Sequence, residues 1–177
     1  MKIIATKRTL TLFVSLLLLT SLLVFSFFKA DAAIKDGQQF GDWAASCKEN
    51  KDKKSTCHLF QSLEASDESK RKIASFKIGY FGSDSLKIVE ILPFGTNLQS
   101  GTAIISDDQN DKLLAKGQFV TCHEYGCVAH AELSEEDLNV ILNATTNYVR
   151  IMSMEGKLIN IPLSNKGLAE AIQSLKK

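Results

Sequence analysis

The sequence has 177 residues, of which 45% are hydrophobic and 23% charged, and its formal net charge at pH 7 is +1. A chain of this length fits one domain and can bury a core without help from metals or crosslinks. The near-neutral charge excludes the strongly basic class of nucleic-acid-binding proteins, so we expect no nucleic acid among the partners.

The first 32 residues have the organisation of a secretory signal peptide. Basic side chains come first, an apolar run follows at 10–28, and small residues up to Ala32 and Ala33 provide an A-x-A cleavage site. Cleavage after Ala32 leaves a mature domain, 33–177, with 17 basic and 19 acidic side chains and a net charge of −2. Because the apolar run approaches the ~20 residues that span a bilayer, an uncleaved membrane anchor is the alternative. Both predict the periplasm or the cell surface.

Most of the mature sequence alternates in the manner of β-strands. In 72–81, Ala74, Phe76, Ile78 and Tyr80 share one face, which indicates a half-buried strand. Further strands are expected at 85–95, 101–106, 117–122, 148–153 and 158–164. Strands of this length and spacing predict one mainly β domain, a β-sandwich or a barrel-like fold. The glycine-containing segment 154–157 predicts a hairpin between the last two strands.

Two segments have helical periodicity instead. In 134–143, Ser134 is placed to cap a helix whose first turn is acidic. In 165–177, apolar residues from Leu168 to Leu175 recur at helical spacing. We therefore expect one short helix near 135–143 and a C-terminal helix near 166–175.

The mature chain contains four cysteines, an even number, and export favours disulfides over free thiols. They are Cys47, Cys57, Cys122 and Cys127. Three pairings are possible, and the local one is favoured because each neighbouring pair brackets a polar segment that would turn between strands. A zinc site built from these cysteines and the histidines beside them is the alternative, but the spacings match no standard zinc finger. A redox centre would need C-x-x-C. We expect two disulfides, no metal and no cofactor.

Three features are candidate binding surfaces. Lys51, Lys53 and Lys54 lie between the first two cysteines and could contact anionic lipid or glycan, which would give peripheral membrane association. His123 and Tyr125 lie between the second two. The structural interpretation of both segments is a solvated turn.

The third feature is Trp43, the single tryptophan, which follows Gly41 and Asp42 and is a candidate ligand platform. A lone tryptophan near a disulfide more often packs on the core.

The sequence lacks the common catalytic fingerprints, including G-x-S-x-G, H-E-x-x-H, the P-loop and the dinucleotide motif. The histidines are His58, His123 and His130. A Ser–His–Asp set would need one of the last two with an acid such as Glu124 or Asp42. We expect no catalytic residue and no enzyme activity.

Several landmarks occur in a fixed order along the mature chain. They are FGDW at 40–43, Gln61, LPFG at 92–95, LQSG at 98–101, CHEYGCVAHAEL at 122–133 and IPLSNKGLAEAIQSL at 161–175. Together they resemble the invasion-associated locus B family of exported bacterial proteins. Leu168 stands where the family usually has an aromatic residue, and Asn165-Lys166 replace a common leucine-containing dipeptide.

The resemblance implies a small, mainly β, periplasmic or surface-associated domain from a Gram-negative bacterium. The family takes its name from a factor that promotes host-cell entry, and the resemblance implies no established enzyme activity or ligand. We therefore expect an exported, virulence-associated accessory or binding protein whose partner is an unknown component of the envelope or host surface. A structural periplasmic protein without a host role and a periplasmic enzyme of unrecognised type are the alternatives.

Overall fold

The computed structural model describes residues 34–49, 55–107 and 111–175. The chain divides into two units, Met1–Ala32 and Ala33–Lys177, and the β-sheet and its helices belong to the second. The predicted signal peptide and the three lysines Lys51, Lys53 and Lys54 lie outside the described residues. Within those residues, no helix is long and apolar enough to cross a membrane.

The described strands form one antiparallel sheet with the spatial order β1-β2-β3-β4-β5-β8-β7-β6-β9-β10. The first half of the sheet is a meander of β1 (Gln39–Phe40), β2 (Trp43–Glu49), β3 (Ser55–Glu64), β4 (Lys72–Gly79) and β5 (Lys87–Leu92). The second half contains β6 (Thr102–Ser106), β7 (Lys112–His123), β8 (Gly126–Glu132), β9 (Asn147–Met152) and β10 (Leu158–Leu163). Antiparallel neighbours need only short connections, which suits the turn-rich sequence.

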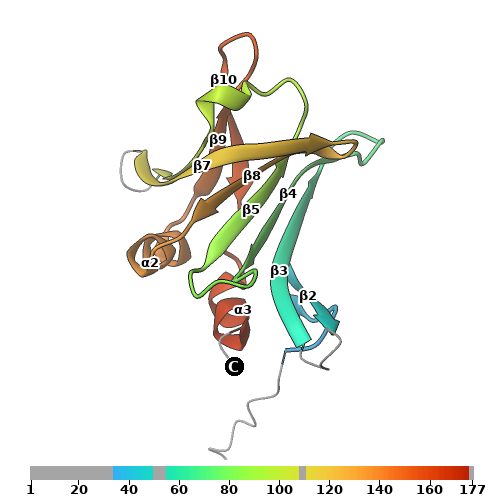
Figure 1. The fold of residues 1–177 in the computed structure, drawn as a ribbon, viewed down its shortest axis with the longest axis vertical. Helices are drawn as coiled ribbons and strands as arrows, with labels where there is room; N and C mark the ends of the chain where they lie inside the picture. The colour runs from blue at the N-terminus through green and yellow to red at the C-terminus, as the bar shows by residue number, and fades with distance from the viewer. Residues whose placement is uncertain (1–33, 50–54, 108–110, 176–177) are drawn as a thin grey trace, which may run out of the picture. The chain divides into compact units, whose positions relative to one another are not determined.

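β7 connects the two halves of the sheet. Its first part pairs with β6 up to Gly117, and its second part pairs with β8 from Gln118 onward. Register shifts occur on both sides of this switch, and such bulges bend a strand and increase its twist. In Figure 1, β7 accordingly runs across the front of the sheet, over the upper part of β5. The sheet bends at β7, so that its two halves share one core.

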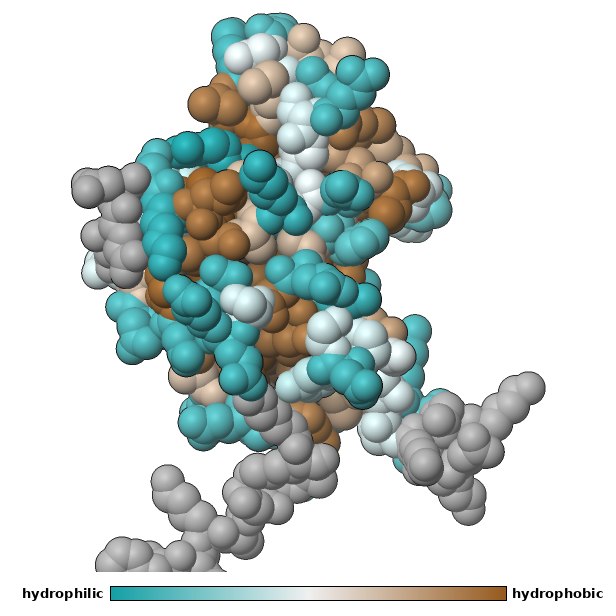
Figure 2. Space-filling view, turned by 60° about the vertical axis from the view of Figure 1, so that its left-hand side comes forward, coloured by the Kyte–Doolittle hydropathy of each residue, from teal (hydrophilic) through white to brown (hydrophobic). Residues whose placement is uncertain are grey.

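The core contains large side chains from both halves of the sheet. Trp43, Phe76 and Ile88 of the first half and Ile104 and Val149 of the second are all completely buried in one cluster. Burial of the apolar side chains in this shared cluster holds the two halves together. On the outer surface that is turned forward in Figure 2, hydrophilic side chains interrupt the apolar ones.

Two α-helices and one 3₁₀ turn accompany the sheet in the described residues. α2 (Glu135–Asn143) begins after Ser134, whose Oγ accepts a hydrogen bond from the Asp137 backbone N–H at 3.0 Å. α3 (Leu168–Leu175) buries Leu168 and Ile172 and contacts β1, β2 and β3. The 3₁₀ turn is η2 (Leu98–Ser100). Both helix predictions and the mainly β fold class are confirmed.

The bounds of β7 differ from the expectation. The strand begins at Lys112, five residues before the predicted start at 117. The additional segment KLLAK contains residues with low strand propensity, and its extended conformation comes from pairing with β6. Tertiary pairing therefore decided this boundary.

Candidate binding site

The segment CHEYGC forms the tip of the β7–β8 hairpin. Cys122 and Cys127 face each other across the two strands and form a disulfide, with Cα atoms 3.9 Å apart. Gly126 has a φ of 135°, and a Cβ at this position would lie 2.5 Å from the carbonyl oxygen of Leu92. The glycine therefore lets the hairpin tip lie directly against the end of β5.

The first two cysteines also form a local disulfide. Cys47 on β2 and Cys57 on β3 are direct cross-strand partners with Cα atoms 4.0 Å apart. Both predicted disulfide pairings are thus confirmed. Each bond joins facing residues of neighbouring strands, so each fixes local strand register.

Trp43 lies at the start of β2 and is completely buried. Its Nε1 donates a hydrogen bond to the carbonyl oxygen of Ser164 at 2.8 Å. Because no part of the side chain reaches solvent, the candidate role of Trp43 as a ligand platform is wrong. The interpretation that the sequence favoured, a ring packed on the core, is what the structure shows.

Trp43 belongs to a contact that we call the terminal clasp, formed by Asp42, Trp43, Gln61, Ser164 and Lys166. Ser164 Oγ donates to Asp42 Oδ2 at 2.7 Å, and the Ser164 backbone N–H donates to Gln61 Oε1 at 3.2 Å. The Asp42 N–H donates to the Lys166 carbonyl oxygen at 3.1 Å. These bonds join the beginning of the sheet to the segment after β10, so the FGDW and IPLSNKG motifs act in closing the fold.

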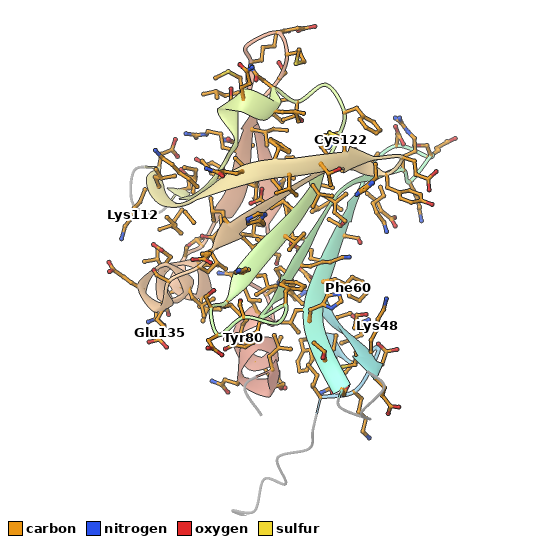
Figure 3. The ribbon with its side chains drawn as sticks, viewed as in Figure 1. Lys48, Phe60, Tyr80, Lys112, Cys122 and Glu135 are labelled. Atoms are coloured by element: carbon orange, nitrogen blue, oxygen red, sulfur yellow. A yellow bond between two sulfur atoms is a disulfide. The ribbon has the colours of Figure 1, made fainter. Side chains whose placement is uncertain are left out.

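A groove of about 790 Å³ lies beside the hairpin tip. Its floor is the outer face of the sheet, where Lys77 is the cross-strand partner of Phe60, and Ser75 is the partner of Ile91. Figure 3 shows β3 with Phe60, and Cys122 near the hairpin end of β7. The volume is typical of a ligand site, for which about 300–1,000 Å³ is usual.

Apolar side chains make up much of the groove lining. They are Phe60, Ile73, Ile91, Pro93, Phe94 and Tyr125. Ile73 is 43% exposed, Phe94 63% and Tyr125 83%, so the lining is open to solvent. The disulfide-linked hairpin supplies Tyr125, and its closeness to β5 makes the tip a wall of the groove.

Among the described residues, three cations and one acid line the same groove and give it a formal charge of +2. They are Arg71, Lys72, Lys77 and Glu124. Arg71 forms an ion pair with Asp67 at 3.6 Å, but both side chains are exposed and such a pair contributes little stability. Within the described ranges, Lys72 and Lys77 form no ion pair. A hydrogen bond with the Glu124 carboxylate raises the pKa of Tyr125, so its phenol is neutral at physiological pH.

Of the predicted surface residues, the structure places Tyr125 in this groove. His123 is exposed on the same hairpin but does not line it. Sequence reasoning missed Ile73 and Phe94. The available signal was an apolar residue on the polar face of 72–81, and an aromatic residue directly after Pro93.

The histidines lie on different parts of the sheet. His58 is half-buried on β3, and burial, with the nearby Lys77 and Lys48 charges, lowers its pKa. His130 is exposed on β8, separated from β3 by β4 and β5. Asp42 is hydrogen-bonded in the terminal clasp, so it does not form a Ser–His–Asp set with His130. Among the described residues, no three His, Cys, Asp or Glu side chains are placed to hold a metal ion.

Glu90 is a buried carboxyl group that the sequence analysis did not identify. It lies on β5 between the inward-facing Ile88 and Leu92 and is completely buried. Burial raises its pKa to about 7, and the nearby Thr102 hydroxyl opposes this to a smaller extent. In the described part of the chain, neither carboxylate oxygen has a hydrogen bond of good geometry. The group therefore couples the stability of the core to pH.

A second polar cluster connects β9 to neighbouring segments. Arg150 Nη2 lies 2.6 Å from Asp111 Oδ2, and Arg150 Nε donates to Asn160 Oδ1 at 2.9 Å. The Tyr148 hydroxyl donates to Asp111 and, with Arg150, holds the pKa of that carboxyl below its usual value. These groups satisfy one another, so we assign the cluster a structural role.

Taken together, these features define a class of small β proteins in which disulfides join neighbouring strands of one bent antiparallel sheet. The model of the family described as Invasion associated locus B protein matches residues 43–176. The chain therefore belongs to the invasion-associated locus B family, as the ordered motifs indicated.

Individual relatives agree with this assignment. The chain is 21% identical over 159 residues to the Invasion protein B homolog of Brucella abortus strain 2308 and to that of biovar 1 strain 9-941, covering 89% of both sequences in each case. The crystal structure of invasion associated protein b from Bartonella henselae is similar with a TM-score of 0.67 at 13% identity. That match covers 78% of this chain and 93% of the other, and it supports the fold.

Proposed function

We propose that this chain is an exported, non-enzymatic binding protein of the bacterial envelope, with the groove beside the β7–β8 hairpin as its binding surface. The observation that carries this proposal is the exposure of Ile73, Phe94 and Tyr125 next to the cations of the same groove. Water-exposed apolar surface gathered in one concave site is a common mark of an interaction surface.

Export is supported by two independent features. The N-terminal sequence has the order of a signal peptide, and disulfides persist mainly in oxidising compartments outside the cytoplasm. An association with host-cell invasion is the further part of the proposal. It is supported by family membership and by the printed names of the Brucella relatives.

A binding role is favoured over catalysis by where the candidate catalytic groups lie. His58 and His130 are on strands that are not adjacent, and Asp42 is engaged in the terminal clasp. The groove instead combines aromatic, aliphatic and cationic side chains, which are the residue types enriched at recognition surfaces.

Site-specific photocrosslinking in intact cells tests the groove directly. A photoreactive residue in place of Phe94 or Tyr125 should give one discrete adduct with an envelope or host-surface component. The control places the same residue at Glu135, which is exposed in the first turn of α2 and far from Cys122 in Figure 3. Equal labelling from all three positions, or none from the groove, would show that the groove is not the binding surface.

The compartment is tested on the same protein. The denatured intact mass of chain recovered from the envelope, alkylated without reductant, should equal that of 33–177 with two disulfides and no alkyl groups. A mass that retains residues 1–32 would identify an anchored protein instead, and four alkylated thiols would contradict the two disulfides of the structure.

A further inference from the structure

We propose that the groove recognises an extended acidic peptide segment, in which apolar side chains lie between two carboxylates. This inference rests on the proposed function, because it names the ligand chemistry of the same groove. Three features of the lining carry it: the positions of the cations, the shape of the floor and the openness of the aromatic wall.

The cations lie toward opposite ends of the groove along β4. Arg71 and Lys72 are at the beginning of the strand, and Lys77 is five residues further along from Lys72. A register shift places one extra residue between Lys72 and Ala74, so Lys72 and Lys77 are about four ladder steps, or about 14 Å, apart along the strand. An extended peptide of six or seven residues spans this distance, so a carboxylate near each end can reach one cation group.

Two small side chains lie on the floor of the groove between the cations. Ser62 on β3 and Ser75 on β4 are direct cross-strand partners. Along their own strands they lie next to the larger Phe60 and Ile73, which project on the same outer face. An apolar side chain of the ligand can lie over the two serines, between Phe60 and Ile73, and remove the exposed surface of Ile73 from water.

The wall next to this floor favours a peptide over a lipid chain. Phe94 and Tyr125 remain 63% and 83% exposed, so a ligand in the groove is covered on one side only. An acyl chain held in this way would leave much of its apolar surface in water. In an extended peptide, alternate side chains point to opposite faces, so apolar residues can face the groove while polar residues face solvent.

The charge of the groove selects the sign of the ligand. Its formal charge of +2 favours carboxylates, and Glu124 at the hairpin tip is the single acid among the described residues of the lining. Lys72 and Lys77 have no ion pair with another described residue, so no such pair has to break when they bind a carboxylate. Binding should therefore weaken as salt rises, because these cations are near the surface.

The test uses protein purified from its envelope and a fluorescent seven-residue peptide. The peptide has aspartate at both ends, valine and phenylalanine at its third and fifth positions, and serine elsewhere. We expect saturable binding by fluorescence anisotropy, weakened about tenfold or more by Lys77→Glu. Peptides with lysine at both ends, or with serine in place of both apolar residues, should bind at least tenfold more weakly.

Lys116→Glu is the matched control, because it makes the same charge change at an exposed lysine on the part of β7 that pairs with β6, outside the groove lining. It should leave peptide affinity within about twofold of the unmodified protein, and urea unfolding midpoints should confirm that both variants are folded. Equal loss of affinity in the two variants would overturn the inference, because it would show a response to net charge alone.

The outcomes separate the ligand chemistry from the proposed function. If groove crosslinking captures a partner but the acidic peptide does not bind, the inference fails while the binding role of the groove stands. If dodecanoate binds in a Lys77-dependent manner and the peptide does not, the groove takes a lipid-like anion and the inference fails. Saturable, salt-sensitive peptide binding that depends on Lys77 and on both apolar positions supports it.

Discussion

The indole N–H of Trp43 donates to the carbonyl oxygen of Ser164 at 2.8 Å, across 121 positions of sequence. The bond links the start of β2 to the residue that follows β10. Because the tryptophan ring is also completely buried, one side chain both fills the core and ties the start of β2 to the segment after β10. The FGDW motif is thus explained by fold closure, and the exposed groove remains the candidate for recognition.

Trp43→Phe should destabilise the domain by about 1–3 kcal/mol. The substitution keeps an aromatic ring but removes the donor, which leaves the Ser164 carbonyl without this hydrogen bond. Urea unfolding followed by circular dichroism measures the change. Phe94→Ala is the control, since Phe94 is 63% exposed and should change stability by less than about 1 kcal/mol. Equal effects of the two substitutions would contradict the role assigned to Trp43.

The two disulfides should contribute similarly to stability but differently to binding in the groove. Replacing both members of either pair by serine should cost about 2–3 kcal/mol, as expected for loops of this length. Only the Cys122/Cys127 replacement should also reduce groove crosslinking, because it frees the hairpin tip that carries Tyr125. If the Cys47/Cys57 replacement reduces crosslinking equally, global stability rather than hairpin position determines binding.

Gly126→Ala should be more destabilising than Gly82→Ala. Both glycines have positive φ, 135° and 80°, but only at Gly126 would a Cβ meet another atom closely, at 2.5 Å from the Leu92 carbonyl oxygen. At Gly82 nothing lies within 4 Å of that position. The difference in unfolding free energy therefore measures the steric cost of separating the hairpin tip from β5. Equal losses would mean that backbone conformation alone requires glycine.

Glu90→Gln should make stability less dependent on pH between about 4.5 and 7. The folded-state pKa of Glu90 is raised from 4.5 to about 7, so the folded protein retains a proton that the unfolded chain releases. The carboxyl group therefore lowers stability as pH rises through this range, by about 3 kcal/mol in total.

Urea unfolding of Glu90→Gln and the unmodified protein at pH 5 and pH 8 measures this effect. The variant should gain stability relative to the unmodified protein on going to pH 8. Glu170→Gln, at an exposed position of α3, should follow the unmodified protein at both pH values. A constant difference between Glu90→Gln and the unmodified protein would contradict a titrating Glu90.

The sequence was most informative where a local signal determines local structure. Alternation in 72–81 placed Ala74, Phe76 and Ile78 on the buried face, and Ser134 with its acidic neighbours marked the start of α2. Cysteines separated by short polar segments indicated local disulfides. In each case the interacting groups are close in sequence, so their spacing carries the information.

Other features depend on groups that meet only after folding. Tertiary structure decided that Trp43 donates to the carbonyl oxygen of Ser164, that β7 extends back to Lys112, and that Glu90 is enclosed by the core. It also brought Phe60 of β3, Ile73 of β4 and Tyr125 of the β7–β8 turn to one groove. The sequence by itself determined the strand periods, helix starts and disulfide framework. Which faces meet was decided by long-range pairing and by the bend of the sheet at β7, because these contacts join residues that no local pattern relates.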